Sequence, residues 1–131
     1  MGNRFWPALF WAAALYNFLA GLPPLLAPAL SMATAGMPPL DPQHVILTQM
    51  MGLLICVFGI GYAMVAMGSP AARQIVLLGI IGKAGVCLLV ALRVREVDLP
   101  ASMLAATVGD LLFVVTFIFF LSRPSPTPAA V

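Results

Sequence analysis

Residues 71–92 read AARQIVLLGIIGKAGVCLLVAL, and Lys83 is the single charged side chain between Arg73 and Arg93. An α-helix rises about 1.5 Å per residue, so a run of this length is roughly as long as the hydrocarbon core of a bilayer is thick, about 30 Å. The segment therefore has the length and composition of a membrane-spanning helix, with one charge at its centre.

The rest of the chain has the same character. Of its 131 residues, 63% are hydrophobic and 8% are charged, whereas soluble domains carry about 25% charged residues. A soluble domain of this size would leave too much apolar surface in water, because small domains keep a large share of their surface exposed. We therefore predict an all-α integral membrane protein, a four-helix transmembrane bundle that forms one domain over residues 1–121. The predicted helices cover residues 5–22, 43–67, 71–92 and 99–121.

Proline, glycine and capping residues define the first connection. Gly21 and Pro23-Pro24 predict the end of the first helix, and the proline-rich connection that follows is too broken to span a membrane. Within it, residues 25–35 are apolar enough to form a short helix on the membrane surface. Asp41 is the predicted N-cap of the second spanning helix.

The later boundaries follow the same rules. Ser69 is a predicted cap of the third spanning helix, and Asp98 is a predicted cap of the fourth. The turn between the second and third helices is tight, so we expect these two helices to pack as an antiparallel hairpin. Residues 122–131 contain three prolines and predict a flexible tail.

Basic residues near the helix ends indicate the orientation, because cytoplasmic ends carry more Lys and Arg. One side holds three arginines and the other holds two arginines with two acids, namely Arg4, Arg73 and Arg123 against Arg93, Arg95, Glu96 and Asp98. The long first connection contains no basic residue. We therefore predict that both termini lie in the cytoplasm.

Two ionisable residues lie deep in apolar runs. Lys83 is ten residues from either flanking arginine, and Asp110 is ten residues from Pro100. Both therefore lie roughly 15 Å inside the bilayer, at matching depths in consecutive antiparallel helices. A lone charge at the bilayer centre costs from about 2.5 to more than 10 kcal/mol. We predict that Lys83 and Asp110 touch, either as an ion pair or with a proton shared between them.

Other polar residues are candidates for a site around this pair. Each shares a helix face with small residues, and small residues let helices approach closely in lipid. We therefore predict that the polar and small faces turn inward and that Phe, Leu, Ile and Val face lipid. The candidate ligand-, proton- or ion-binding residues are Lys83, Asp110, Asn17, Gln49 and Thr107.

Several kinds of chemistry lack the residues that they need. His44 is the only histidine and lies at a helix end, so we expect neither a bis-histidine haem site nor a catalytic triad inside the membrane. Cys56 and Cys87 lie in separate apolar runs without a CxxC pair, which argues against redox and zinc sites. The basic residues are scattered, which argues against nucleic-acid binding. We expect no catalytic residue, metal or cofactor, and hence no enzyme.

The order of apolar segments and polar residues in this chain also resembles that of a known family. Isolated polar residues stand inside the apolar segments of a short chain, at Tyr16-Asn17, Gly82-Lys83 and Gly109-Asp110. With its proline-broken first connection, the chain over residues 5–121 resembles the small bacterial DoxX-like four-helix membrane proteins. The resemblance implies a multi-pass protein of the bacterial inner membrane. It also implies a partner role, because members of that group often serve redox or stress-response proteins, and it carries over no catalytic residue.

Three functions remain open from the sequence. The first is a small non-catalytic subunit or partner of a larger membrane assembly, in contact with membrane lipids and with other membrane protein chains. The second is an oligomeric transporter or channel-like protein that uses Lys83 and Asp110. The third is binding of a lipid or a quinone-like molecule in the polar core. The Lys83–Asp110 pair can equally be structural and lock two helices in register.

Overall fold

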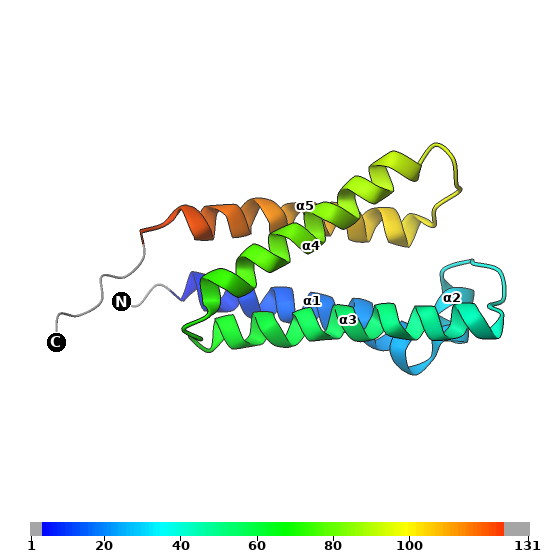
Figure 1. Cartoon of the computed structure of the whole chain (residues 1–131), viewed down its shortest axis with the longest axis horizontal. Coiled ribbons are helices and arrows are strands. Elements are labelled where there is room, and N and C mark those ends of the chain that lie inside the picture. Colours follow the sequence, from blue (N-terminus) through cyan, green and yellow to red (C-terminus); the bar gives the residue numbers. More distant parts are fainter. Residues whose placement is uncertain (1–3, 125–131) are drawn as a thin grey trace.

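The computed structural model describes residues 4–124, which form five α-helices and no strand (Figure 1). One of them, α2 (Pro28–Thr34), is short, and the other four are long and apolar enough to cross a membrane. The prediction of an all-α transmembrane bundle is confirmed, and the chain is an integral membrane protein. The four long helices are α1 (Phe5–Leu26), α3 (Pro42–Ala66), α4 (Ala72–Arg93) and α5 (Ala101–Ser122).

The first helix is longer than its prolines predict. α1 continues through Pro23 and Pro24 to Leu26, so the predicted end at Leu22 is wrong. The fixed φ of proline near −65° fits the helix, but each ring removes one backbone N–H from the last turns of α1. The carbonyl of Pro23 also accepts a hydrogen bond from the N–H of Ala27 at 2.9 Å, which closes the last turn.

The short helix α2 and the start of α3 agree with the sequence. α2 lies within the segment 25–35, which was predicted to be helical. Asp41 is the N-cap of α3, and its carboxylate accepts a hydrogen bond from the backbone N–H of His44 at 2.9 Å. A second contact joins the carboxylate to Nδ1 of the His44 ring at 2.6 Å. The backbone hydrogen bond, followed by the contact with the ring, lowers the pKa of Asp41 from its ordinary value.

The caps predicted for the two later helices are wrong. α4 begins at Ala72, and the Ser69 hydroxyl instead accepts a hydrogen bond from the Ala71 N–H within the turn. The N-cap of α5 is Pro100 rather than Asp98. The fixed φ of proline suits this position, and its carbonyl receives the first hydrogen bonds of the helix. The predicted tail over 122–131 lies largely outside the described residues, and Ser122 still belongs to α5.

The four long helices are arranged as two antiparallel pairs. α1 packs against α3, and α4 packs against α5 (Figure 1). A tight turn joins α3 to α4, and Gly68 in that turn has a φ of 86°, which favours glycine. α4 leaves this turn at an angle to α3 and makes much less contact with it than α1 does. The predicted antiparallel hairpin of α3 and α4 therefore packs only near its turn, where Gly79 lies against Tyr62.

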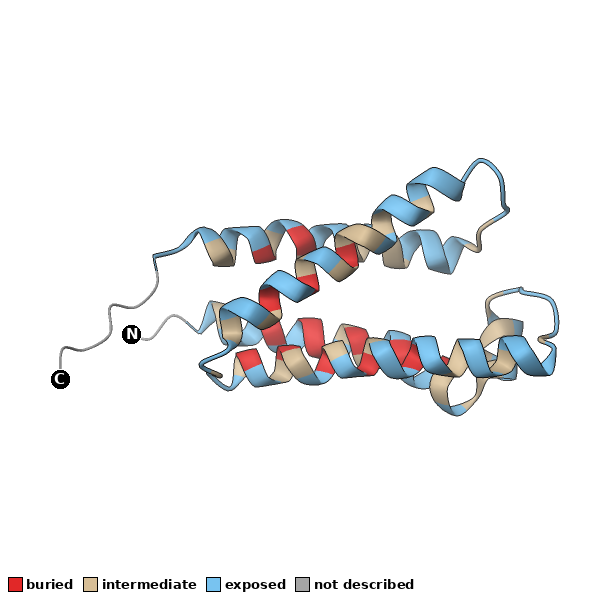
Figure 2. Cartoon of the chain, in the orientation of Figure 1, coloured by how far each residue is buried: buried red, intermediate tan, exposed pale blue. Residues whose placement is uncertain are grey.

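The hydrophobic core lies toward the end of the bundle that contains the α3–α4 turn (Figure 2). Its largest fully buried side chains are Tyr62, Phe10, Phe117 and Val76. The rings of Phe10 and Phe117 stack with their centroids 5.2 Å apart. The prediction that phenylalanines face lipid is wrong at these two positions, because aromatic rings fill the space where the two helix pairs meet.

Burial is uneven between the two pairs. Lys83 is the last buried residue of α4, and Val114 is the first buried residue of α5. The halves of α4 and α5 next to their connecting loop therefore bury no residue within the described chain (Figure 2). In the most apolar 18-residue window of each helix, 33% of the residues are buried in α1 but only 11% in α5. The two pairs are packed together at one end and diverge at the other.

Candidate functional site

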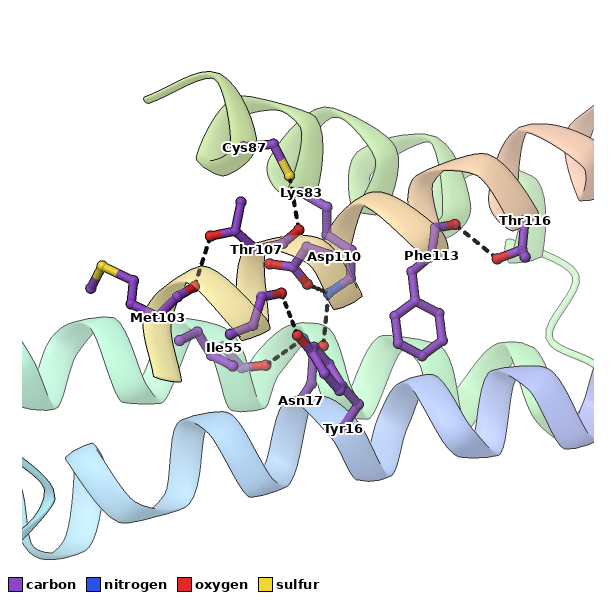
Figure 3. Close-up of polar contacts among 11 residues, drawn as sticks. Tyr16, Asn17, Ile55, Lys83, Cys87, Met103, Thr107, Asp110, Phe113 and Thr116 are labelled. Atoms are coloured by element: carbon purple, nitrogen blue, oxygen red, sulfur yellow. Dashed lines mark hydrogen bonds and ion pairs between the residues drawn. The ribbon is translucent and has the colours of Figure 1, made fainter. Parts of the chain in front are cut away.

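The candidate site is centred on Lys83, halfway along α4. Lys83 is only 7% exposed, and its ammonium nitrogen contacts Oδ1 of Asp110 on α5 (Figure 3). The predicted contact between the two residues is confirmed. The side chain of Asp110 is more exposed than that of Lys83, at 17% against 8%. The carboxylate therefore lies at the edge of the site and the ammonium group lies inside it.

Asn17 connects this pair to the other two long helices. Its side-chain oxygen accepts a hydrogen bond from Nζ of Lys83 at 3.1 Å. Its side-chain nitrogen donates to the backbone carbonyl of Ile55 on α3 at 3.1 Å. Asn17 is itself buried on α1, so one chain of contacts runs from α5 through α4 and α1 to α3 (Figure 3). We call Asn17, Lys83 and Asp110 the central network.

Three aromatic rings surround the ammonium group. Nζ of Lys83 lies 5.1 Å from the ring centre of Tyr16, 5.5 Å from that of Phe113 and 5.8 Å from that of Tyr62. Lysine has three N–H donors, and two of them have oxygen partners in Asp110 and Asn17. The ring faces carry partial negative charge and attract the cation at these distances. The rings therefore add to the stabilisation of a charge that is removed from water.

Two glycines make room for the two tyrosines. A Cβ atom at Gly79 would lie 2.6 Å from the hydroxyl of Tyr62, and one at Gly109 would lie 2.6 Å from the hydroxyl of Tyr16. The Tyr16 hydroxyl passes Gly109 and donates a hydrogen bond to the carbonyl of Ala106 on α5. This bond is a second link between α1 and α5 beside the central network. Neither tyrosine is among the site residues predicted from the sequence.

The hydroxyl of Tyr62 is buried and has no hydrogen-bond partner among residues 4–124. Tyr62 is fully buried, at 0% exposure, and its ring is one of the three around Lys83. Burying a hydroxyl without a partner costs roughly 1–3 kcal/mol in proteins. The Tyr62 hydroxyl is therefore one polar group of the site for which the described residues provide no hydrogen-bond partner.

Two of the predicted site residues lie elsewhere. Gln49 donates to the carbonyl of Leu25 at 3.2 Å, near the other end of the α1–α3 pair. Thr107 donates to the carbonyl of Met103 one turn earlier in its own helix and has no bond to the central network. Its own backbone carbonyl faces the thiol of Cys87 at 3.5 Å. Neither residue belongs to the central network, because the Gln49 side chain bonds to a backbone carbonyl of α1 and the Thr107 side chain bonds to a carbonyl of its own helix.

The face of the α4–α5 pair carries an open groove of about 430 Å³. Its walls are almost wholly apolar, and it lies in the part of the pair that buries no residue within the described chain. The residues that line it are Cys87, Leu88, Val90, Ala91, Val94, Thr107, Val108 and Leu111. No group of three or more His, Cys, Asp or Glu side chains in residues 4–124 is placed to hold a metal ion.

Comparison with known proteins gives no match to a family model, to a curated protein or to a solved structure. The resemblance to DoxX-like proteins therefore remains a hypothesis.

Proposed function

We propose that this protein is a small non-catalytic membrane subunit that binds another membrane protein chain along its α4–α5 pair. The observation that carries the proposal is the uneven burial of the four helices. In an 18-residue apolar window of each helix, 11% of the residues are buried in α5 and 17% in α4, against 33% in α1. Side chains that face lipid gain little from each other, so helices in membranes associate through shape and polar contacts. An open groove on the poorly covered pair offers such a shape.

The central network supports a structural role for the buried charges. Each member has partners inside the chain, because Lys83 contacts both Asp110 and Asn17 and Asn17 also reaches a carbonyl of α3. A buried charge with these partners fixes the mutual position of the helices, since breaking one contact leaves another group unpaired. The network then keeps the α4–α5 face in one shape for its partner.

We also propose that the protein lies in a bacterial inner membrane with both termini in the cytoplasm. The two ends of the bundle differ in charge, and the end with Arg4, Arg73 and Arg123 has no acidic side chain. Excess arginine marks the cytoplasmic side. The resemblance to DoxX-like proteins agrees with this location, and three of the residues that carry the resemblance form the central network.

Photo-crosslinking in native membranes tests the proposed association. A photoreactive amino acid at Leu88 or Leu111 would lie in the α4–α5 groove, and the matched controls are Leu19 on α1 and Ile60 on α3, which are at least as exposed as Leu111. We expect a discrete protein adduct, either a second copy or another chain, from the groove positions only. Equal adducts at all four positions, or none in the groove, would contradict the proposal. A lipid adduct alone in the groove would favour the lipid-binding alternative.

A second candidate is movement of a proton or a cation through an oligomer. The unpartnered hydroxyl of Tyr62 beside Lys83 favours it, because such a group can bind water next to the pair. Flux in proteoliposomes tests this candidate. It requires that Asp110→Asn abolishes flux while Thr107→Val, which alters a residue outside the network, preserves it. Equal flux in both variants, or no flux from the unmodified protein, would remove the candidate.

A further inference from the structure

The end of the bundle that contains the α3–α4 turn is positively charged. Three arginines lie there, one at the start of α1, one in the first turn of α4 and one just after α5: Arg4, Arg73 and Arg123 (Figure 1). The four acidic side chains of the sequence lie at the other end or in the middle, at Asp41, Glu96, Asp98 and Asp110. Basic groups at a membrane surface attract anionic lipids.

Arg73 is held in a defined position at this end. Its guanidinium donates to the carbonyl of Leu121 at 2.6 Å and to that of Arg123 at 3.2 Å, at the end of α5. The end of a helix has carbonyls without intrahelical partners, and these are satisfied here by an arginine from the neighbouring helix. A guanidinium has five N–H donors, so two such bonds leave three for another acceptor. The arginine is thus both fixed and still able to bind an anion.

Arg73 also forms the polar rim of a groove between α4 and α5. The groove has a volume of about 310 Å³ and is lined by Arg73, Gln74, Leu77 and Leu121. Leu77 lies one helical turn deeper than Arg73, toward the middle of the bundle. The groove therefore combines a cation and an amide with two leucine side chains, Leu77 one turn deeper and Leu121 beside Arg73 at the end of α5. It is separate from the central network and from the groove at Leu88 and Leu111.

We propose that this groove binds one anionic phospholipid, with the phosphate at Arg73 and Gln74 and an acyl chain along Leu77 and Leu121. Guanidinium groups bind phosphate oxygens through paired hydrogen bonds. A free phosphate would use only the polar rim, whereas a phospholipid uses the apolar wall as well. The proposal does not rest on the proposed function, because this groove lies at the other end of the α4–α5 pair from the groove at Leu88 and Leu111.

Arg123 strengthens this interpretation. Its guanidinium lies 5.0 Å from the ring centre of Trp6, which packs edge-on against Phe120 at 5.3 Å. Tryptophan is typical of the boundary between lipid and water, so the second cation lies at the depth of the lipid headgroups. Both arginines are positioned by neighbours within the chain, and neither contacts a carboxylate in the residues described.

Native mass spectrometry and lipid titration of the purified protein test the proposal. The probes are phosphatidylglycerol, which is anionic, and phosphatidylcholine, which is zwitterionic, with the same acyl chains. We expect one tightly retained phosphatidylglycerol and binding weaker by about fivefold in Arg73→Gln. Leu77→Trp should also weaken binding by filling the groove, and it leaves the bonds between Arg73 and α5 in place. Arg95→Gln, which removes a cation at the opposite end, should bind like the unmodified protein.

Three outcomes would overturn the proposal. The first is equal retention of the two lipids by the unmodified protein. The second is loss of binding in Arg95→Gln as large as in Arg73→Gln, which would indicate a general effect of charge. The third is competition by soluble glycerol phosphate at the affinity of the intact lipid, because the leucine wall would then contribute nothing. If Arg73→Gln is unfolded, phosphatidylglycerol binding by Leu77→Trp with an unchanged melting temperature is the test. Binding as tight as in the unmodified protein would then overturn the proposal.

Discussion

The α1–α3 pair and the α4–α5 pair are held together by different means. In α1–α3 the backbones themselves touch, because a Cβ atom at Gly52 would lie 2.6 Å from the carbonyl oxygen of Gly21 and 2.7 Å from the backbone nitrogen of Leu25. In α4–α5 there is no close backbone contact at Gly85, where a Cβ atom would meet nothing within 4 Å among the described residues. Polar side chains connect that pair instead.

The polar contacts of α4–α5 are spread along the helices. The Lys83–Asp110 contact lies in the middle, the Cys87 thiol faces a carbonyl of α5, and Arg73 closes the end of α5. The two helix pairs therefore have opposite weaknesses. One pair should be sensitive to any added side-chain volume, and the other should be sensitive to the loss of a charge.

Removal of one buried charge should have the largest effect. Lys83→Met leaves Asp110 without its cation and Asp110→Leu leaves Lys83 without its anion, so each should lower the free energy of unfolding by about 3–5 kcal/mol. The double variant should recover much of that loss, because neither charge is then stranded. Steric trapping or reversible unfolding in micelles measures these values. Additive losses in the double variant would contradict the interpretation of the contact as an interdependent pair.

The close contact of α1 with α3 predicts the next effect. Gly52→Ala should lower the free energy of unfolding by about 1–3 kcal/mol, because the added methyl group meets backbone atoms that cannot rotate away. Gly85→Ala is the matched control in α4 and should cost almost nothing. Equal stability of the two variants under the same unfolding conditions would show that the backbones of α1 and α3 do not touch.

A smaller difference is expected between the two tyrosines. Tyr16→Phe removes the hydrogen bond to Ala106 and should cost about 0.6 kcal/mol, the mean for such bonds between membrane helices. Tyr62→Phe removes a hydroxyl that has no partner in residues 4–124, so it should be neutral or stabilising. The same unfolding assay compares them. A larger loss for Tyr62→Phe would mean that its hydroxyl binds a water molecule or a ligand.

The smallest effect concerns the N-cap of α3. The pKa of Asp41 is lowered from 3.8 in the folded chain by its bonds to His44, so its stabilising contribution is present above pH 3.8 and is lost as the pH falls through the lower folded value. The hydrogen-exchange protection factors of the first-turn amides of α3, which are corrected for the intrinsic exchange rate, should fall in that acidic range. Asp41→Asn retains a capping side chain and should show no such pH dependence. The same fall in protection factor in both proteins would contradict this.

The main features of the fold were predictable because they depend on position along one helix. The length and apolarity of four segments predicted the spanning helices, and equal depth predicted the contact between Lys83 and Asp110. Asn17 was named as a candidate because it shares a helix face with small residues. The arguments for the helices and for the Lys83–Asp110 contact require only the rise per residue and the cost of burying a polar group.

The remaining features depend on how the helices cross. The short turn predicted an antiparallel α3–α4 hairpin. α3 packs mainly against α1, because Gly52 lets the two backbones touch. Tyr16 and Tyr62 could not be predicted in this way, because the position of a ring over Lys83 depends on the angle at which the helices cross. Gln49 and Thr107 were assigned to the site because of the helix faces on which they lie. Face alone does not reveal that a backbone carbonyl nearby already satisfies the side chain.

The central claim is that Asn17, Lys83 and Asp110 hold the two helix pairs in one relative position. Spin labels in a cysteine-free variant test it by pulsed electron resonance in nanodiscs, with one pair of labels at Leu19 and Leu112 and a control pair at Leu19 and Ile60. In Lys83→Met, we predict that the distance distribution between Leu19 and Leu112 broadens while that between Leu19 and Ile60 stays narrow. An unchanged distribution between Leu19 and Leu112 would contradict the claim.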